Sequence, residues 1–263
     1  IINDLFDLKY DKTHPEKKFR PLASGKISIG FSIKFAILLV ITGHLIIYMK
    51  SLNCMIISFL YFTINLFYSY KLKQIPIIDF VIISIGFVLR LYIGGEISSI
   101  ELSNWIIIMV LLISIFIAAS KRRDDVYNYE IHNKIHRDVV KEYNLIFIDK
   151  IITIVSSVLI VSYLLFITSE EILSKHNFPK ILIFTFLLVL IGILRFNQIT
   201  YVYKKSSSPI KIFFKDSFLQ IVLIIWILSY LYVKMPKKKE EVEVKESEEE
   251  VIIKKKKKNQ KKT

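Results

Sequence analysis

The stretch from residue 105 to residue 120 reads WIIIMVLLISIFIAAS, and the five residues that follow it, 121–125, read KRRDD. An uncharged apolar run of this length is near the lower limit for a helix that crosses a hydrocarbon core of about 30 Å. The run shows no strand-like alternation of apolar and polar residues, and open strands do not occur in lipid. The stretch therefore predicts a membrane-spanning helix that ends at a strongly charged segment.

Six other apolar segments resemble this one, and 53% of the 263 residues are hydrophobic. The fold class predicted is all-α, a polytopic transmembrane helical bundle with seven helices in this chain. Together with the stretch quoted above, the predicted helices cover residues 33–48, 54–70, 77–94, 105–120, 151–168, 181–195 and 218–233.

The charged residues between these segments predict the orientation of the chain. Residues 1–30, 71–76, 121–150 and 195–216 are rich in Lys and Arg, and the loops between them are short. Basic loops favour the cytoplasmic side, so we expect a multi-pass protein of the cell membrane with these four segments in the cytoplasm. We expect residues 1–234 to form the transmembrane domain. The Lys- and Glu-rich residues 235–263 are expected to form a disordered tail.

The formal net charge of +14 has several explanations. A basic chain can bind nucleic acid, anionic lipid or a phosphorylated substrate. The excess of Lys and Arg in cytoplasmic loops is a simpler cause of the same charge. The single cysteine, Cys54, cannot form an internal disulfide and says nothing about the redox compartment.

The opening segment carries three carboxylates at regular spacing. On a helix, Asp4, Asp7 and Asp11 lie within roughly a 60° arc of one face, because each residue turns the helix by about 100°. Like charges on one face repel each other unless a positive charge lies between them. Oxygen ligands without Cys or His favour Mg²⁺ over Zn²⁺. The spacing therefore predicts an Mg²⁺ site, with Asn3 assisting.

The same segment continues with Lys17, Lys18 and Arg20. Mg²⁺ usually binds through one or two carboxylates together with substrate phosphates. Acidic and basic groups side by side are therefore typical of a diphosphate site. The alternative is a solvated loop whose charges of both signs have no ligand.

The second long polar segment, 121–150, contains four candidate substrate-binding residues, Lys121, Arg122, Arg137 and Tyr143. Arg suits phosphate because its planar guanidinium binds two oxygens at once. The alternative for the cations is anchoring of the chain at the cytoplasmic face. Because both long segments are expected on the same side of the membrane, they could line one site.

Two ionisable residues, Asp79 and Arg90, lie inside a predicted spanning helix. Charges in the membrane are costly and are usually paired or functional. The two residues share a helix face about 16 Å apart. A structural and a functional role are equally compatible with the sequence.

With these residues in hand, the chain resembles the UbiA superfamily of intramembrane prenyltransferases, and within it the decaprenyl-phosphate phosphoribosyltransferase branch. The superfamily motif is Asn3-Asp4-x-x-Asp7-x-x-x-Asp11, and the branch is suggested by its continuation and by three later motifs. These are His14-Pro15-x-Lys17-x-x-Arg20-Pro21-x-Ala23-x-Gly25, Asp79 with Gly86-Phe87-Val88-Leu89-Arg90, Lys121-Arg122-Arg123, and Ser208-Pro209 leading to Lys215-Asp216.

The resemblance implies a bundle of about nine helices, so we expect this chain to be an N-terminally truncated form that lacks the first two. It also implies Mg²⁺-dependent transfer of 5-phosphoribose from phosphoribosyl diphosphate to a polyprenyl phosphate in the bilayer, without nucleic acid. A homo-oligomer is left open. Prenyltransferases carry a second Asp-rich motif where this chain has 121–125 as KRRDD, and this departure disfavours a prenyl diphosphate donor.

The resemblance assigns the following roles. Asp4, Asp7 and Asp11 with Asn3 would hold Mg²⁺, and Lys17 and Arg20 with Lys18 would neutralise the diphosphate. Lys121, Arg122 and Arg137 would bind the 5-phosphate of the donor or the phosphate of the lipid, with Tyr143 forming a hydrogen bond nearby. The alternatives are a prenyltransferase with a prenyl diphosphate donor and an aromatic or lipid acceptor, and a non-catalytic transporter or scaffold.

Overall fold

The computed structural model describes residues 1–13, 17–132, 138–175, 179–203 and 209–233, and every regular element in these ranges is helical. The predicted tail, residues 235–263, lies outside the described residues, as do His14 and Arg137. The prediction of an all-helical fold is confirmed.

Each of the seven predicted apolar segments forms one long helix. Six of these helices are long and apolar enough to cross a membrane. The seventh, α11, is apolar but only 17 residues long, so the prediction of seven full-length spans holds for six helices of the described chain. The long helices are α3 (Ile29–Tyr48), α4 (Leu52–Tyr70), α5 (Ile78–Ser98), α6 (Asn104–His132), α7 (Leu145–Ile167), α9 (Pro179–Tyr201) and α11 (Ser217–Val233).

Short polar side chains mark where several helices begin. Ser28 accepts a hydrogen bond from the Phe31 backbone N–H at the start of α3, and Ser51 accepts one from Cys54 at the start of α4. Asp216 does the same for Leu219 in α11. These caps satisfy backbone N–H groups that have no partner within the helix.

The boundaries of α6 and α7 differ from the prediction. Helix α6 continues to His132 instead of ending at residue 120, and α7 begins at Leu145 instead of residue 151. The prediction that the residues KRRDD open a loop is therefore wrong. Hydropathy marks where a helix leaves an apolar environment, whereas Lys, Arg and Glu are good helix formers and let the helix continue into water.

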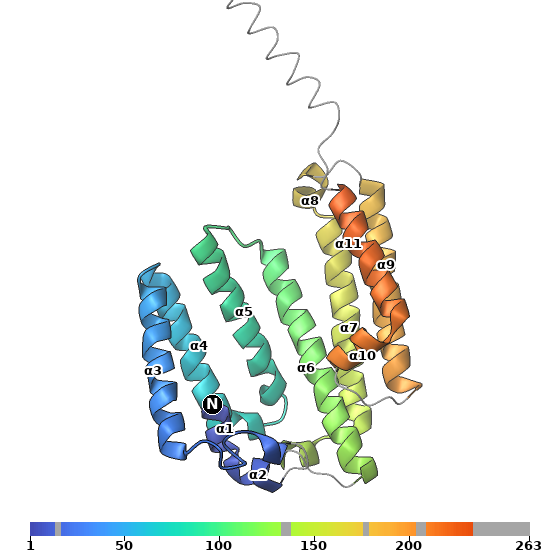
Figure 1. Ribbon diagram of the computed structural model, residues 1–263. Helices are drawn as coiled ribbons and strands as arrows, with labels where there is room; N and C mark the ends of the chain where they lie inside the picture. The colour runs from blue at the N-terminus through green and yellow to red at the C-terminus, as the bar shows by residue number, and fades with distance from the viewer. Residues whose placement is uncertain (14–16, 133–137, 176–178, 204–208, 234–263) are drawn as a thin grey trace, which may run out of the picture. The chain divides into compact units, whose positions relative to one another are not determined.

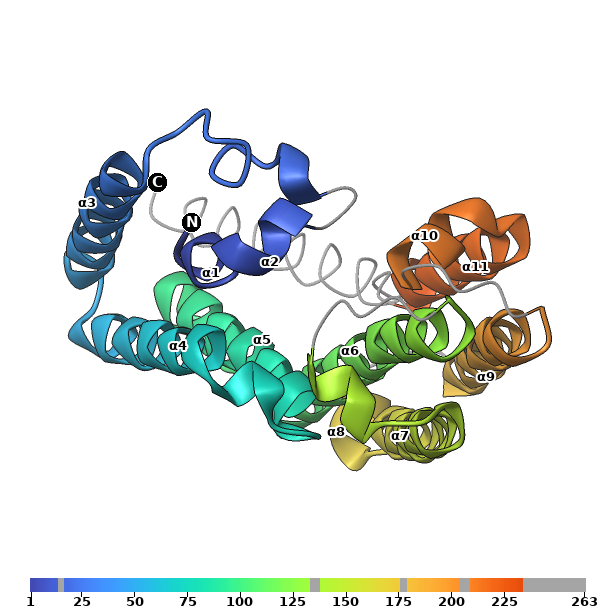
Figure 2. The ribbon, with the colours of Figure 1, turned by 90° about the horizontal axis from the view of Figure 1, so that it is seen from below.

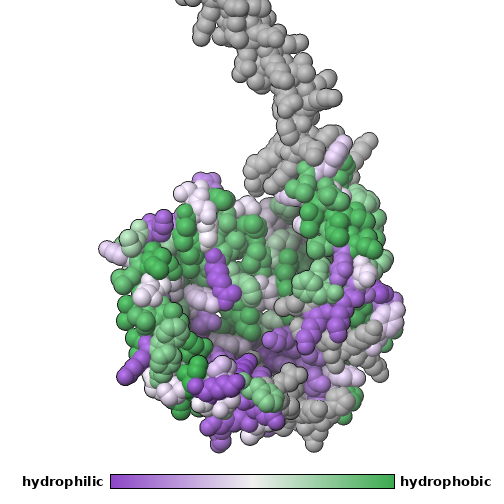
Figure 3. Space-filling view, viewed as in Figure 1, coloured by the Kyte–Doolittle hydropathy of each residue, from purple (hydrophilic) through white to green (hydrophobic). Residues whose placement is uncertain are grey.

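Contacts divide the chain into two compact units, and the first contains residues 1–162 and 197–215. Within it, α3 packs on α4, α4 on α5, and α5 on α6. The short helices α1 (Ile2–Phe6) and α2 (Leu8–Thr13) lie at one end of these four helices, as Figures 1 and 2 show. Hydrophilic side chains gather at this end, while apolar side chains cover the long helices (Figure 3).

The packed core of the first unit also lies near this end. Buried residues of α5, α6 and α7 surround the short 3₁₀ helix η3 (Asp138–Glu142). The core therefore fixes the second polar segment against the helix ends. The fully or almost fully buried residues of this cluster are Phe80, Val126, Val139, Val140, Tyr143 and Ile148.

The second unit contains residues 163–196 and the chain from residue 216 onward. Its interior holds a chain of hydrogen bonds in which Trp226 donates to the Tyr163 hydroxyl and that hydroxyl donates to Thr185. Both distances are 2.9 Å. These bonds join α7, α9 and α11 and satisfy polar groups that would be costly in lipid.

Candidate active site

The opening segment folds as two short helices that break at Asp7, whose φ of −89° and ψ of 0° lie outside the helical range. The prediction that the three aspartates lie on one continuous helix is therefore wrong at Asp7. The three aspartates still lie near one another, because α1 packs against α3 and α4 and α2 follows α1 directly.

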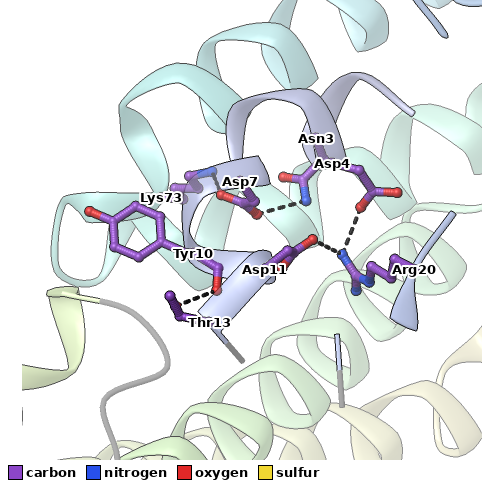
Figure 4. A network of polar contacts seen from close by, with 8 residues as sticks. All are labelled: Asn3, Asp4, Asp7, Tyr10, Asp11, Thr13, Arg20 and Lys73. Carbon is purple, nitrogen blue, oxygen red and sulfur yellow. Dashed lines mark hydrogen bonds and ion pairs between the residues drawn. The ribbon is translucent and has the colours of Figure 1, made fainter. Parts of the chain in front are cut away.

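Arg20 joins two of the three carboxylates. Its Nη1 atom lies 2.7 Å from Asp4 Oδ1 and 2.9 Å from Asp11 Oδ2 (Figure 4). The Asp11 side chain is only 3% exposed, whereas those of Asp4 and Arg20 are more than one-third exposed. A single guanidinium thus holds a buried and a half-exposed carboxylate together.

The third carboxylate has other partners. Asp7 accepts a hydrogen bond of 2.9 Å from the Asn3 amide and forms an ion pair with Lys73 (Figure 4). Lys73 belongs to the 3₁₀ helix η2 (Leu72–Gln74) between α4 and α5. Sequence reasoning missed Lys73 as a site residue, because it counted only toward the positive charge of the loop.

A pocket opens beside these groups, and its walls come from three separate segments. Tyr10 of α2 donates a 3.2 Å hydrogen bond to Asp138 of η3. The prediction that the two long polar segments lie together is therefore confirmed. The lining residues are Asp7, Tyr10, Asp11, Lys17, Lys73, Gln74, Asp138 and Val139. Lys18 is absent from this set, and its ammonium lies 5.1 Å from the centre of the Phe19 ring.

Asp138 also changes the acidity of Tyr10. The pKa of the Tyr10 phenol is raised above its ordinary value, first by the hydrogen bond to Asp138 and then by the charge of that carboxylate. Tyr10 therefore remains a neutral hydrogen-bond donor at neutral pH.

The residues of the opening segment fit Mg²⁺ in their chemistry, since Asn3, Asp4, Asp7 and Asp11 offer only oxygen ligands. Among the described residues, however, no three His, Cys, Asp or Glu side chains are grouped closely enough to hold a metal ion. Arg20 lies between Asp4 and Asp11, and Lys73 pairs with Asp7, so cationic side chains already neutralise the three carboxylates. Such a site suits a metal that arrives with substrate phosphates rather than a permanently bound ion.

A second, buried cluster forms around Asp79, which is fully buried at the start of α5. Its carboxylate forms an ion pair with Arg122 of α6, with 2.6 Å between Oδ2 and Nε, and accepts a 2.8 Å hydrogen bond from the Tyr143 hydroxyl. The Tyr143 hydroxyl in turn accepts a hydrogen bond from the backbone N–H of Ile77. Arg122 also pairs with Asp125 at 2.7 Å.

Burial explains the properties of this second cluster. Desolvation raises the pKa of Tyr143 well above its ordinary value, so the phenol stays protonated. The Arg122 side chain is 5% exposed and engaged with two carboxylates. Arg122 thereby links α5 to α6, and its predicted role in binding substrate phosphate stays a prediction.

The neighbouring cations of α6 differ from each other. Arg123 is buried, pairs with Asp149 of α7 at 2.6 Å and stacks on Tyr201. Lys121 is exposed and lies at the polar end of an apolar groove between α5 and α6. The groove has a volume of about 420 Å³, and its lining residues are Ile83, Phe87, Val110, Ile113, Ser114, Ile117, Ala118, Lys121, Arg122 and Asp125.

The other intramembrane charge, Arg90, is not part of either cluster. It donates hydrogen bonds to the Tyr61 hydroxyl and stacks on the rings of Tyr61 and Phe87, each 4.9 Å away. A Cβ at Gly86 would lie 3.3 Å from the Tyr61 ring, so glycine allows this ring to pack closely on α5. The aromatic contacts offset part of the cost of a cation at this depth.

A known protein family matches this chain, which has an aspartate-rich opening segment and a helical membrane domain. The model of the UbiA prenyltransferase family matches residues 1–224. The chain belongs to this family. It is accordingly a multi-pass integral membrane transferase of the UbiA superfamily.

The individual relatives include two kinds of enzyme. A decaprenyl-phosphate phosphoribosyltransferase of Corynebacterium glutamicum is 29% identical over 63% of this chain and 50% of its own length. The enzyme of that name in Mycobacterium tuberculosis is 25% identical over 86% of this chain and 74% of its own length. A digeranylgeranylglyceryl phosphate synthase of Sulfolobus acidocaldarius is 34% identical over 41% of this chain and 38% of its own length.

The extent of these similarities is limited, and one of them is structural. The chain spans about half the length of the C. glutamicum relative and of its Mycolicibacterium smegmatis counterpart. A solved structure from work on digeranylgeranylglyceryl phosphate synthase in membranes superposes with a TM-score of 0.57 and 19% identity. That match covers 89% of this chain and 79% of the other. It establishes the UbiA fold for this chain.

Proposed function

We propose that this UbiA protein transfers 5-phosphoribose from phosphoribosyl diphosphate to a polyprenyl phosphate and releases pyrophosphate. The observation that carries the proposal is the placement of two binding regions in one unit. A pocket lined by acidic and basic groups lies at the end of the helices, and an apolar groove with an exposed lysine at its polar end runs between α5 and α6. The similarity to decaprenyl-phosphate phosphoribosyltransferases supports it.

The donor would bind in the pocket. Asp4, Asp7 and Asp11 with Asn3 would hold Mg²⁺ on the pyrophosphate, where the ion supplies charge neutralisation and a template for the leaving group. Lys17 and Lys73 line the pocket and would contact phosphate oxygens. Arg20 keeps the carboxylates of Asp4 and Asp11 together and adds positive charge beside the leaving group.

The acceptor would place its isoprenoid chain in the apolar groove and its phosphate at the polar end. Lys121 is exposed there and is suited to bind that phosphate. Arg122 would keep α5 and α6, which form the groove, in position, because Asp79 and Asp125 hold its guanidinium. Arg137 lies outside the described residues and stays a prediction for the same phosphate.

The buried cluster links the two regions. Tyr143 binds both Ile77 and Asp79, Ile77 follows the pocket residue Gln74 by three positions, and Arg122 lines the groove. A fixed cluster at this place keeps the donor and acceptor regions at a constant separation. Holding two reactants in register is a large part of what an enzyme does for such a reaction.

In the proposed reaction, an oxygen of the lipid phosphate attacks the anomeric carbon and the bond to pyrophosphate breaks, with inversion. No strong general base is needed, because a phosphate is already anionic at neutral pH. Negative charge grows on the leaving group, so preorganised cations are the main requirement. Lys17, Lys73 and Arg20 would supply them.

The test is transfer of labelled phosphoribose to polyprenyl phosphate by membranes that contain the full chain, with and without Mg²⁺. We expect metal-dependent transfer, reduced at least about 100-fold in Asp7→Asn, the scale seen when one electrostatic contact to a transition state is lost. Lys12→Met is the matched control, because Lys12 lies in α2 and is exposed but is not a pocket-lining residue. Transfer that is unchanged in Asp7→Asn would contradict the metal assignment.

A second candidate is a prenyltransferase with a prenyl diphosphate donor, favoured by the similarity to digeranylgeranylglyceryl phosphate synthases. It predicts that the same membranes transfer a labelled prenyl group and no phosphoribose. A non-catalytic transporter or scaffold predicts transfer of neither group.

A further inference from the structure

The lining of the polar pocket carries two kinds of polar group. Asp7 is paired with Lys73 and Asp11 with Arg20, so these carboxylates belong to a network of opposite charges. Tyr10, Gln74 and Asp138 also line the pocket, and they come from α2, η2 and η3. The paired Asp7 and Asp11 have the charge pattern of a metal-diphosphate site.

Asp138 is the pocket carboxylate that retains the most capacity to accept hydrogen bonds. Its side chain is 49% exposed, compared with 21% for Asp7 and 3% for Asp11. One oxygen accepts from the Tyr10 hydroxyl and the other contacts Lys141 of the same short helix, both at 3.2 Å. Each carboxylate oxygen has two lone pairs, so both can accept a further bond from a ligand.

We infer that Asp138, assisted by Gln74, recognises the ring hydroxyls of a sugar diphosphate donor. The inference rests on the proposed function and deepens it, because it names the residue that selects a ribosyl donor over a prenyl donor. A carboxylate that accepts from a ribose hydroxyl is a common means of sugar recognition in proteins. The amide of Gln74 can donate to one hydroxyl and accept from another.

A hydroxyl-binding role also agrees with the present partners of Asp138. The partners of Asp138 are a phenol and an ammonium, Tyr10 and Lys141, and both of these groups donate hydrogen bonds as a ribose hydroxyl does. A prenyl diphosphate has no hydroxyl to offer. That donor would displace water from the half-exposed Asp138 carboxylate without giving it a new hydrogen bond, which is unfavourable. The residue would therefore favour the sugar donor and disfavour the prenyl donor at once.

The experiment compares phosphoribosyl diphosphate with its 2-deoxy and 3-deoxy analogues as donors, in wild-type membranes and in Asp138→Ala. We expect the wild type to prefer the ribose donor over at least one analogue by roughly 10- to 100-fold in kcat/KM, the usual value of a hydrogen bond to a charged group. Asp138→Ala should lose this preference, because its kcat/KM for the ribose donor should fall while its kcat/KM for that analogue stays nearly the same. Asp138→Asn, which keeps an acceptor oxygen, should restore part of it.

Tyr10→Phe is the matched control, because it removes a partner of Asp138 but keeps the acceptor. It should retain the preference between donors. If Asp138→Ala slows all three donors equally, Asp138 has only a structural role and the inference is overturned. If the wild type transfers no phosphoribose at all, the proposed function fails as well, so the two failures are distinguishable.

Discussion

The first unit of this UbiA protein contains two clusters in which aspartates face arginines, and they differ in exposure. In the opening segment, Arg20 and Asp4 are 38% and 37% exposed. In the buried cluster, Arg122 and Asp79 are 5% and 0% exposed. Both pairs are close, with distances of 2.7 Å and 2.6 Å, so distance alone does not separate their roles.

Exposure does separate them. Water screens the exposed Asp4–Arg20 pair of the opening cluster, so this pair is weak and a substrate or metal can rearrange it at little cost. The buried cluster cannot lose one partner without leaving a charge in an apolar environment. We therefore assign ligand binding to the opening cluster and the fixing of α5 against α6 to the buried one.

The largest expected effect is on stability, in Asp79→Ala. This change leaves the Arg122 guanidinium buried with one carboxylate fewer, and the free energy of unfolding should fall by about 3–5 kcal/mol. Reversible unfolding in mixed micelles measures it. A loss below about 1 kcal/mol would show that the buried pair does not hold the two helices together.

The next largest effect is on activity, in Asp7→Asn. Asparagine keeps the size of the side chain and removes one negative charge, so transfer should fall by roughly 100- to 1,000-fold. Its unfolding free energy should fall by less than that of Asp79→Ala, because the pair with Lys73 is less buried than the pair of Asp79 with Arg122. Loss of stability comparable to that of Asp79→Ala would place Asp7 among the structural residues instead.

Tyr143→Phe should have an intermediate effect, about 1–3 kcal/mol in unfolding free energy. The change removes a hydroxyl that bonds both Asp79 and the Ile77 backbone, and it leaves those buried groups with one partner fewer. The measurement is the unfolding free energy of the variant and the wild type at a series of pH values.

The pH dependence of this difference has a defined sign. Because burial raises the pKa of Tyr143 in the folded state, its stabilisation is fully present below the ordinary tyrosine pKa of 10.0 and is lost as the pH rises through the raised value. The difference between the two proteins should thus be constant between about pH 6 and pH 9. A difference that already declines in this range would contradict the buried position of the hydroxyl.

The smallest effect is expected for Asp4→Asn, at most about 1 kcal/mol in stability, as is usual for exposed ion pairs. This difference should shrink further at high salt, because screening weakens exposed pairs more than buried ones. A salt-independent loss would show that the Asp4–Arg20 pair is more buried in solution than in this structure.

Sequence patterns predicted the positions of the helices well, but they did not predict which residues the charged side chains contact. Apolar run length located all seven long helices, because lipid leaves the backbone few alternatives. The end of α6 was missed because charged residues can extend a helix beyond the apolar region. Arg20 and Lys73 illustrate the second difficulty: the sequence shows their charges but not which carboxylates they reach, since Lys73 lies 66 positions from Asp7.

The candidate site was predicted in part. The spacing of Asp4, Asp7 and Asp11 selected a group of carboxylates of which Asp7 and Asp11 line the pocket, and loop charges predicted that residues 121–150 could line the same site. Asp138 gave no signal in sequence, because a single aspartate in a polar segment is ordinary. Its place in the pocket follows from the fold, which brings η3 against α2.

The measurement that tests the central claim most directly is the unfolding midpoint of the chain with Mg²⁺, with pyrophosphate, and with both together. If the opening cluster binds a metal-diphosphate pair, only the combination should raise the midpoint in the wild type, by the equivalent of about 2.7 kcal/mol at 100 times the dissociation constant. The shift should disappear in Asp7→Asn and persist in Lys12→Met. An equal shift with pyrophosphate alone, or an unchanged shift in Asp7→Asn, would contradict the assignment of ligand binding to this exposed cluster.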